Sequence, residues 1–412
     1  MRKEIVGIVV GGGPAPGING VISAATIEAI NEGKEVIGIV GGFNSLFDGR
    51  GEIFRTLTIE EVSRIHNRGG SILRTSRNYE GDARDKINTL LFTLKRFGIK
   101  YLIAIGGEGS LFMANWIRNE TKDAIKVVHV PKTIDNDIPL PWGLSTFGYE
   151  TARHVGVQLV TNLMEDARTM GRWYFITTMG RHAGHLALGI GKAAGATITL
   201  IPEEFPENKV PVSKVAAILA GSIVKRLAMD RDHGVAVMAE GLVEKLDIRE
   251  EDLGQYDRDE MGRMRLSEIH LGEILKAAVR KILDRWNLKI TVVDKDIGYE
   301  LRAADPIPFD VEYTRNLGYG AIRFLLSGGS GSTIAAYLGH LTPVPFEDLV
   351  DPETGKAKIR PVDINSATYE VARKYMIRLE PQDFQGNNLP SLCDVLKARP
   401  EEFGEVFAPA VS

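Results

Sequence analysis

Two loops decide the fold of this chain: IGGEGS, residues 105–110, and PKTIDND, residues 131–137. Each follows an apolar run that predicts a buried strand, 101–105 before the first loop and 125–130 before the second. Neighbouring parallel strands end at the same edge of a sheet, where open α/β sheets bind ligands. Glycines there let phosphate oxygens approach the backbone, and carboxylates beside them suit a metal ion or a proton transfer. Together the two loops indicate phosphoryl transfer.

Predicted strands and helices alternate along much of the chain. The first are strand 5–10, helix 17–31 and strand 35–40, and a second series begins with strand 173–178. This alternation predicts βαβ units around mostly parallel sheets. A chain of 412 residues is too long for one hydrophobic core, so we expect two α/β domains.

The composition narrows the class of protein. A net charge of −4 and a pI near 6.1 give no surface-wide attraction for nucleic acid or an anionic membrane. The apolar segment 186–201 is too short and too interrupted by glycines to span a bilayer. The single cysteine, Cys393, excludes an intrachain disulfide, which fits a reducing compartment. We therefore expect a cytoplasmic protein without nucleic-acid or membrane partners. We assign no function to the charged stretch 244–265 or to the tail after residue 351.

Glycine-rich turns are the candidate anion sites. In GGGPAPG, residues 11–17, a strand, a turn and a helix start would point backbone N–H groups at an anion. The G-x-G-x-x-G spacing is missing and no acid ends the second strand, which argues against a dehydrogenase. In the 105–110 loop, the N–H groups of Gly109 and Ser110 could hold a donor phosphate, and Glu108 could hold Mg²⁺. An ordinary tight turn with a surface acid is the alternative.

The 131–137 loop is the candidate catalytic segment. We expect Asp135 and Asp137 to face opposite ways, one toward substrate and the other toward metal or backbone. A carboxylate that accepts a hydroxyl proton is the base of kinase-type transfer. Asx-turn capping before the following prolines is the alternative, but Lys132 and Thr133 beside the two acids exceed what a turn needs.

Basic and polar residues also follow or precede other predicted strands. Arg74 and Arg77 follow a glycine pair, and arginine forks match phosphate bidentately. Each remaining position is unremarkable alone, but as a set they are what a sugar phosphate would require. They are Arg172, Met179, Gly180, Arg181, Glu240, Tyr299 and Arg302.

As a set, these motifs resemble the phosphofructokinase family from the start of the chain to about residue 323. The motifs are GGxxPGxN at 12–19, GGSxLxxSR at 69–77, GGEGS at 106–110, PKTIDND at 131–137, MGRxxG at 179–184 and GYELR at 298–302. The resemblance implies two Rossmann-like three-layer α/β/α domains with the active site in the cleft between them. It implies discontinuous domains: 1–146 with about 300–350 for the phosphoryl donor, and 147–299 with about 351–412 for fructose 6-phosphate.

The resemblance also implies roles for single residues. Asp135 resembles the base that takes the 1-hydroxyl proton of fructose 6-phosphate, and Asp137 resembles the supporting acid. Thr133 and Ile134 are expected to line the same substrate, and the resemblance places Thr133, Lys132 and Arg181 in the catalytic set with the two acids. The remaining sugar-binding positions are Met179, Gly180, Arg181, Glu240, Tyr299 and Arg302.

The donor site and the assembly follow from the same resemblance. Arg77 and Lys132 would offset charge that develops during transfer, with Glu108 holding Mg²⁺. Arg172 resembles an arginine that reaches the 6-phosphate in a neighbouring subunit, which implies a homodimer or homotetramer. The donor-phosphate positions are Gly13, Arg77, Gly107, Glu108, Gly109 and Ser110.

Three positions bear on the choice of donor. Glu108 stands where aspartate is usual in the family, which keeps a carboxylate for the metal. Lys132 is typical of members that use pyrophosphate or belong to mixed-substrate groups. Gly109 stands where pyrophosphate users carry an aspartate that repels the α-phosphate of ATP, so glycine leaves room for ATP. We weight Gly109 more and expect a glycolytic, MgATP-dependent 6-phosphofructokinase, with a reversible pyrophosphate-dependent enzyme as the alternative.

Other functions explain less of the sequence. A lipid or NAD kinase shares a similar glycine turn but leaves PKTIDND, MGR and GYELR unexplained. A non-catalytic sugar-phosphate sensor on the same fold would be expected to lose its acids, and here Glu108, Asp135 and Asp137 are all present. The arginines of the usual effector site do not map onto this sequence, so allosteric control is unsupported.

Overall fold

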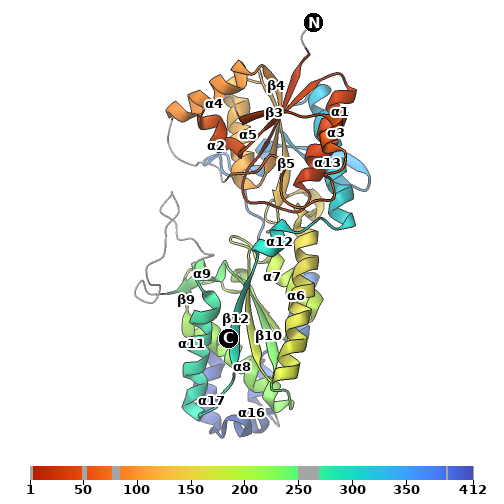
Figure 1. The fold of residues 1–412 in the computed structure, drawn as a ribbon. Coiled ribbons are helices and arrows are strands. Elements are labelled where there is room, and N and C mark those ends of the chain that lie inside the picture. The colour runs from red at the N-terminus through yellow and green to blue at the C-terminus, as the bar shows by residue number, and fades with distance from the viewer. Residues whose placement is uncertain (1–2, 49–52, 77–83, 249–268, 387, 412) are drawn as a thin grey trace. The chain divides into compact units, whose positions relative to one another are not determined.

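The computed structural model describes residues 3–48, 53–76, 84–248, 269–386 and 388–411 (Figure 1). Most of the charged stretch 244–265 therefore lies outside the described residues. The chain forms two compact units, each built from separate segments. Unit 1 comprises Met1–Ala152 and Tyr299–Arg360, and unit 2 comprises Arg153–Gly298 and Pro361–Ser412.

Unit 1 contains an eight-stranded, mostly parallel sheet with the order β14-β13-β5-β4-β1-β2-β3, and β6 pairs with β5. The edge strands β3 and β14 run antiparallel to their neighbours. The strands are β1 (Ile5–Val10), β2 (Glu35–Ile39), β3 (Phe54–Thr56), β4 (Ile99–Gly106), β5 (Lys126–Thr133), β6 (Phe147–Gly148), β13 (Ser332–Tyr337) and β14 (His340–Pro345).

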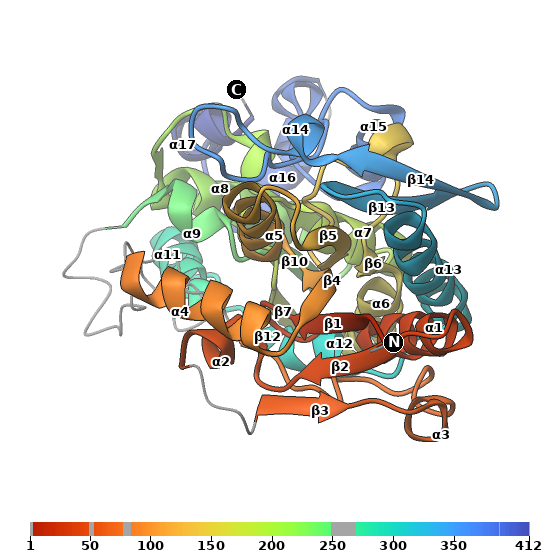
Figure 2. The same cartoon turned by 90° about the horizontal axis from the view of Figure 1, so that it is seen from above.

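Helices cover both faces of this sheet, because alternate strand residues point to opposite faces. Ile8 of β1 belongs to the core that contains α1 (Ile18–Asn31) and α13 (Pro308–Leu326), and these two helices lie side by side in Figure 2. Val9 joins the core of the other face, formed with α2 (Gly42–Asp48), α4 (Arg84–Arg96), α5 (Glu108–Thr121) and α14 (Phe346–Leu349). The short helices α3 (Ile59–Val62), η2 (Pro141–Gly143) and α12 (Tyr299–Ala303) complete the unit.

The first boundary between the units lies inside helix α6 (Tyr149–Met170). The buried carboxylate of Asp310 accepts hydrogen bonds from the Gly148 N–H (2.8 Å), the Thr151 N–H (2.8 Å) and the Thr151 hydroxyl (2.6 Å). These bonds satisfy N–H groups at the start of α6 and hold its first turn in unit 1. The expected boundaries at 146 and about 350 lie about six and about ten residues before those observed, Ala152 and Arg360.

Unit 2 contains a parallel sheet with the order β12-β7-β10-β8. Phe175 and Met238 lie in one core with helices α8 and α11, while α7 packs on the other face. The strands are β7 (Trp173–Thr178), β8 (Ile198–Leu200), β10 (Gly234–Ala239) and β12 (Val292–Ile297), and β9 (Val210–Pro211) pairs with β11 (Leu246–Asp247). The helices are α6, α7 (His185–Ala194), α8 (Val212–Ala228), α9 (Leu242–Lys245), α11 (Leu271–Leu283), α15 (Ala367–Tyr375), α16 (Asn388–Leu396) and α17 (Pro400–Phe407), with the short helices η3 (Pro202–Glu204), η5 (Asp284–Trp286), η6 (Pro381–Phe384) and η7 (Ala408–Ala410).

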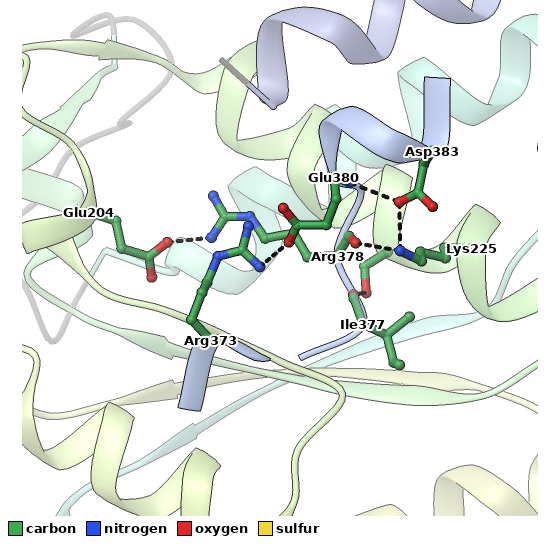
Figure 3. Close-up of polar contacts among 8 residues, drawn as sticks. Glu204, Lys225, Arg373, Ile377, Arg378, Glu380 and Asp383 are labelled. Atoms are coloured by element: carbon green, nitrogen blue, oxygen red, sulfur yellow. Dashed lines mark hydrogen bonds and ion pairs between the residues drawn. The ribbon is translucent and has the colours of Figure 1, made fainter. Parts of the chain in front are cut away.

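The C-terminal segment is attached to unit 2 by apolar and ionic contacts. Phe403 and Phe407 of α17 are fully buried in the same core as α8. Lys225 on α8 donates to the Asp383 carboxylate at 2.6 Å and to the Arg378 carbonyl at 2.9 Å (Figure 3). The guanidinium of Arg378 forms an ion pair with Glu204. The segment from Pro361 onward thus forms short helices that belong to unit 2.

The α/β class and the mostly parallel sheets predicted from the sequence are confirmed. In the part of the chain that the structure describes, no helix is both long and apolar enough to cross a bilayer.

Candidate functional site

Three candidate loops leave the same edge of the unit 1 sheet, because β1, β4 and β5 are adjacent parallel strands. The Gly11 N–H donates to the Ile105 carbonyl at 2.8 Å, which ties the first glycine loop to the second. A Cβ atom on Gly106 would overlap the Ser110 Oγ and would lie 2.9 Å from the Gly11 carbonyl oxygen. Only glycine therefore fits where the two loops approach each other.

Helix α5 begins inside the second glycine loop, with Gly107 as its N-cap and Glu108 in its first turn. The N-terminus of a helix favours an anion through its exposed N–H groups. The Ser110 N–H donates to the Gly107 carbonyl at 3.0 Å, so this amide is used within the turn. Gly109 lies half-buried between them. The predicted donor-phosphate positions of this loop are thus brought to one helix start.

Lys132 is a buried cation at the end of β5. The strand extends to Thr133, so Lys132 belongs to the sheet and only the residues after Thr133 form a loop. Its side chain is 4% exposed, and its Nζ donates to the Gly13 carbonyl at 2.5 Å. Burial lowers the pKa of Lys132 to about 8; the Asp135 and Asp137 carboxylates oppose that shift and the Arg302 cation adds to it. These four charges therefore interact within one site.

Arg302 lies in unit 1 beside the first glycine loop. A Cβ atom on Gly13 would lie 3.0 Å from the Arg302 Nη1, and the guanidinium stacks over the Tyr299 ring at 4.6 Å from its centroid. The bounds expected from the sequence put Tyr299 at the end of the sugar domain and Arg302 at the return to the donor domain. The structure places both on α12 in unit 1, with Arg302 beside the donor-phosphate position Gly13.

The loop after β5 is held by its own polar groups. The Asp135 N–H donates to the Thr133 hydroxyl at 3.0 Å, and the Thr146 hydroxyl donates to the Thr133 carbonyl at 2.7 Å. Burial alternates along the loop: Ile134 and Asn136 are buried, whereas Asp135 and Asp137 are half-buried. Both candidate acids are therefore partly open to solvent, and the expectation that they face opposite ways stays a prediction.

The buried His129 supports the second glycine loop and was not found by sequence reasoning. Its Nε2 lies 2.8 Å from the Gly106 carbonyl oxygen, which can only accept, so Nε2 carries the proton. Its Nδ1 lies 3.0 Å from the Thr333 hydroxyl. Burial lowers the pKa of His129 to about 4, and the nearby Lys132 cation contributes to this shift. The imidazole is therefore neutral near pH 7.

Arg77 lies outside the described residues, but the segment before it is attached to the first glycine loop. The Thr75 hydroxyl donates to the Gly12 carbonyl at 2.6 Å, and the Gly12 N–H donates to the Ser76 carbonyl at 2.7 Å. Asn19 of the GGxxPGxN motif donates to the Gly69 carbonyl at 3.2 Å. The motif around Gly69 and the motif around Gly12 thus form one structural unit.

Among the residues described by the structure, no group of three or more His, Cys, Asp or Glu side chains could hold a metal ion. Mg²⁺ is usually bound through one or two carboxylates together with substrate phosphates and water. The carboxylate of Glu108, in the first turn of α5, could therefore be one ligand of a Mg²⁺ ion whose other ligands are donor phosphate oxygens and water.

The candidate sugar loop of unit 2 follows β7. The Gly180 N–H donates to the Glu240 Oε1 at 3.2 Å, and the Glu240 N–H donates to the Thr178 carbonyl at 2.9 Å. Arg181 Nε donates to Glu244 Oε1 at 3.0 Å. A Cβ atom on Gly298 would lie 2.5 Å from the Met179 Cγ, so glycine leaves the space that Met179 fills. The structure therefore brings Met179, Gly180, Arg181 and Glu240 together.

Arg172 lies at the opposite end of β7 from this loop. It directly precedes the strand, and its Nε is 3.5 Å from the Asp166 Oδ2, which also accepts from the Tyr174 hydroxyl at 2.5 Å. Six residues at about 3.3 Å each separate the two ends by about 20 Å. The structure does not bring Arg172 together with Arg181 of the same chain.

Comparison with known protein families shows that the family model described as "Phosphofructokinase" matches residues 5–325 of this chain. The chain is 53% identical to the pyrophosphate–fructose 6-phosphate 1-phosphotransferase of Thermotoga maritima over 98% of both chains. It is 45% identical to the protein of the same name in Naegleria fowleri, over 98% of this chain and 94% of that protein.

More distant relatives carry a different name. The chain is 32% identical to the ATP-dependent 6-phosphofructokinase of Mycobacterium leprae, over 84% of this chain and 94% of that protein. Among solved structures, the pyrophosphate-dependent phosphofructokinase of Marinobacter aquaeolei matches with a TM-score of 0.67 and 17% identity, over 96% of this chain and 92% of that one. At this identity the match concerns the fold alone.

Proposed function

Because the chain belongs to the phosphofructokinase family and is thus a phosphotransferase, we propose that it transfers a phosphoryl group from pyrophosphate to the 1-hydroxyl of D-fructose 6-phosphate. The products are fructose 1,6-bisphosphate and phosphate. The observation that carries this proposal is the 53% identity, over nearly the whole of both chains, to a relative named for pyrophosphate. The ATP-dependent enzyme expected from Gly109 is supported only at the level of the family, since the Mycobacterium leprae relative is 32% identical.

Two cations near the donor loops, the buried Lys132 and the half-buried Arg302, are consistent with a compact, highly charged donor. Gly109 leaves space for an α-phosphate, but space alone supplies no attraction for a nucleotide. Lys132 and Arg302 place positive charge beside Gly13, where a diphosphate would lie against the backbone. The charge of Lys132 acts strongly there because its side chain is shielded from water. This argument favours Lys132 over Gly109 as the marker of the donor.

The proposed chemistry assigns Asp135 as the base. Its carboxylate accepts the proton of the sugar 1-hydroxyl as that oxygen attacks the donor phosphorus, while Asp137 supports the same loop. Lys132 and Arg302 stabilise the charge that develops on the transferring group, and Arg77 is proposed for the same role. Mg²⁺ held by Glu108 and the donor phosphates would neutralise further charge. Thr133 and Ile134 are proposed to line the acceptor.

Unit 2 is proposed to bind the sugar phosphate through the loop after β7. Glu240 would accept from sugar hydroxyls while it holds Gly180, and Arg181 would supply positive charge. Arg172 is at the far end of the strand, so we assign it to the 6-phosphate site of a neighbouring subunit in a homodimer or homotetramer. We place this reaction in the cytoplasm.

The test is the initial rate of fructose 1,6-bisphosphate formation from fructose 6-phosphate and Mg²⁺, with pyrophosphate or ATP as donor. We expect turnover with pyrophosphate and, in reverse, turnover with phosphate and fructose 1,6-bisphosphate. A Gly109→Asp variant should keep the pyrophosphate reaction, because the added carboxylate excludes only a larger donor. Turnover with ATP alone would make Gly109 the determinant and would overturn the proposed donor.

A further inference from the structure

We propose that Arg360 is a positioning residue that sets the geometry of the catalytic loop 131–137. This inference rests on the proposed function of Asp135 as the base. Arg360 lies outside residues 5–325, which the family's sequence model matches, and it is the last residue of unit 1. None of the sequence motifs includes it.

The contacts of Arg360 converge on the residue between the two candidate acids. Its Nε and Nη2 donate to the Asn136 carbonyl at 3.1 and 2.8 Å, and Nη2 also donates to the Asn136 Oδ1 at 2.5 Å. Its Nη1 donates to the Leu144 carbonyl at 2.9 Å. Its backbone N–H donates to the Asp137 carbonyl at 2.7 Å. One residue therefore fixes the loop at several points.

Asn136 adopts a backbone conformation that needs such support. Its φ is 57°, in the left-handed region that residues with side chains rarely occupy. Its buried Oδ1 also accepts from the Thr146 N–H at 3.1 Å. Strained conformations of this kind persist only where the surroundings hold them. Because Asn136 joins Asp135 to Asp137, its orientation determines where both carboxylates point.

The chemistry of arginine suits this task. The guanidinium presents several N–H donors in one rigid plane, whereas a lysine ammonium would supply a single point of attachment. Burial lowers the pKa of Arg360, and the Asp137 carboxylate opposes that shift. A cation removed from water is costly unless hydrogen-bonded, so the bonds to Asn136 and Leu144 also keep Arg360 in place.

The test is a double-mutant cycle with pyrophosphate as donor, using Arg360→Met, Asp135→Ser and both together. Misplacement of a reacting group by about 1 Å costs up to roughly 10²-fold in rate, so we expect Arg360→Met to lower kcat by roughly 10- to 100-fold. The KM for fructose 6-phosphate should change by less than about threefold, because the sugar-binding groups proposed for unit 2 stay in place and Thr133 is held in β5. In the Asp135→Ser background, Arg360→Met should add less than about a threefold loss, because the base it positions is gone.

Arg226 gives a matched control. It is also a partly buried arginine whose Nε donates to a backbone carbonyl, that of His233, at 3.1 Å, but it lies on α8 in unit 2. We expect Arg226→Met to lower the thermal midpoint about as much as Arg360→Met while kcat stays within about twofold of wild type. If Arg360→Met does not fold, two further variants test the same positioning role, and each should lower kcat. Arg360→Lys keeps the charge but not the fork, and Asn136→Gly keeps the left-handed backbone but removes the Oδ1 acceptor.

The outcomes separate the two proposals. The positioning role would be overturned if kcat stayed at the wild-type value in Arg360→Met, Arg360→Lys and Asn136→Gly. A large loss of kcat in Asp135→Ser would at the same time leave the proposed reaction intact. A loss from Arg360→Met that is equally large in the Asp135→Ser background would also overturn it, because a general structural defect acts independently of the base. Full turnover in Asp135→Ser would remove both proposals.

Discussion

Each unit holds a lysine by a short hydrogen bond, and the two lysines differ in exposure and in partner: Lys132 is buried, whereas Lys225 is half-buried. Lys132 in unit 1 donates to the neutral carbonyl of Gly13, and its surroundings lower its pKa to about 8. Lys225 in unit 2 donates to the carboxylate of Asp383, which is itself buried (Figure 3). A carboxylate compensates a buried ammonium, whereas a carbonyl leaves most of its charge to act on its surroundings.

This difference separates a lysine suited to chemistry from one suited to stability. The charge of Lys132 is costly to the fold and is of use only when an anion such as a phosphate approaches. The charge of Lys225 is balanced within the protein, and it connects α8 to the C-terminal segment through Asp383 and the Arg378 carbonyl. Substitutions in the two regions should therefore affect different measurements.

The largest effect is expected for Asp135, whose carboxylate influences Lys132. Asp135→Ser removes the proposed base, which should lower kcat by roughly 10²- to 10⁴-fold. Binding of fructose 6-phosphate should be largely kept, because the sugar contacts proposed for unit 2 and for Thr133 and Ile134 are unchanged. Steady-state kinetics and a direct binding titration check the two parts, and wild-type kcat in this variant would remove Asp135 from the mechanism.

The sequence could predict the loops because their signals are local. Glycine turns after apolar strands, such as Gly106 to Ser110 after β4, are visible within a few residues, and the alternation of strands and helices gave the α/β class. Arg172 could be separated from Arg181 in the same way, since one precedes and the other follows a six-residue strand. The role assigned to Arg77 stays a prediction.

The missed residues depend on contacts that are distant in sequence. Arg360 is 224 residues from Asn136, and His129 bonds to Thr333 across 204 residues. No motif spacing reports such contacts in a single sequence. The place of Arg302 beside Gly13 was missed for the same reason, because the chain returns to unit 1 only at Tyr299.

The next largest effect is expected when Lys132 or Lys225 is replaced by methionine. Lys132→Met should lower kcat by roughly 10²-fold, because it removes a preorganised charge at the transferring group. Its free energy of unfolding at pH 7 should stay within about 1 kcal/mol of wild type, because the lost charge was costly to bury. Lys225→Met should do the reverse and lower the free energy of unfolding by about 2–4 kcal/mol, because Asp383 keeps an uncompensated buried charge.

Chemical denaturation and kinetics on the folded fraction measure these two variants. The turnover of folded Lys225→Met should equal that of wild type. If Lys132→Met lost as much stability as Lys225→Met and kept its turnover, the distinction between the two lysines would fail. The exposed pair of Lys374 and Glu370 on α15 provides a baseline, since pairs of this kind contribute little to stability.

The smallest effect is a pH dependence of stability that follows from Lys132 alone. Its pKa is about 8 in the folded protein and 10.5 ordinarily, so between these values the unfolded chain binds more protons than the folded protein. Below about pH 8 the buried charge of Lys132 lowers the free energy of unfolding. This unfavourable contribution decreases as the pH rises above about 8 and the folded protein loses the proton. Relative to Lys132→Met, the wild-type free energy of unfolding should increase by about 1–2 kcal/mol between about pH 7.5 and about pH 9.5.

Lys374 provides the control for this prediction. Its pKa is raised through its bond to Glu370, so the difference in the free energy of unfolding between wild type and Lys374→Met should stay constant over this range. A flat difference for Lys132→Met as well would mean that Lys132 titrates normally and that its burial does not prepare it for a phosphate.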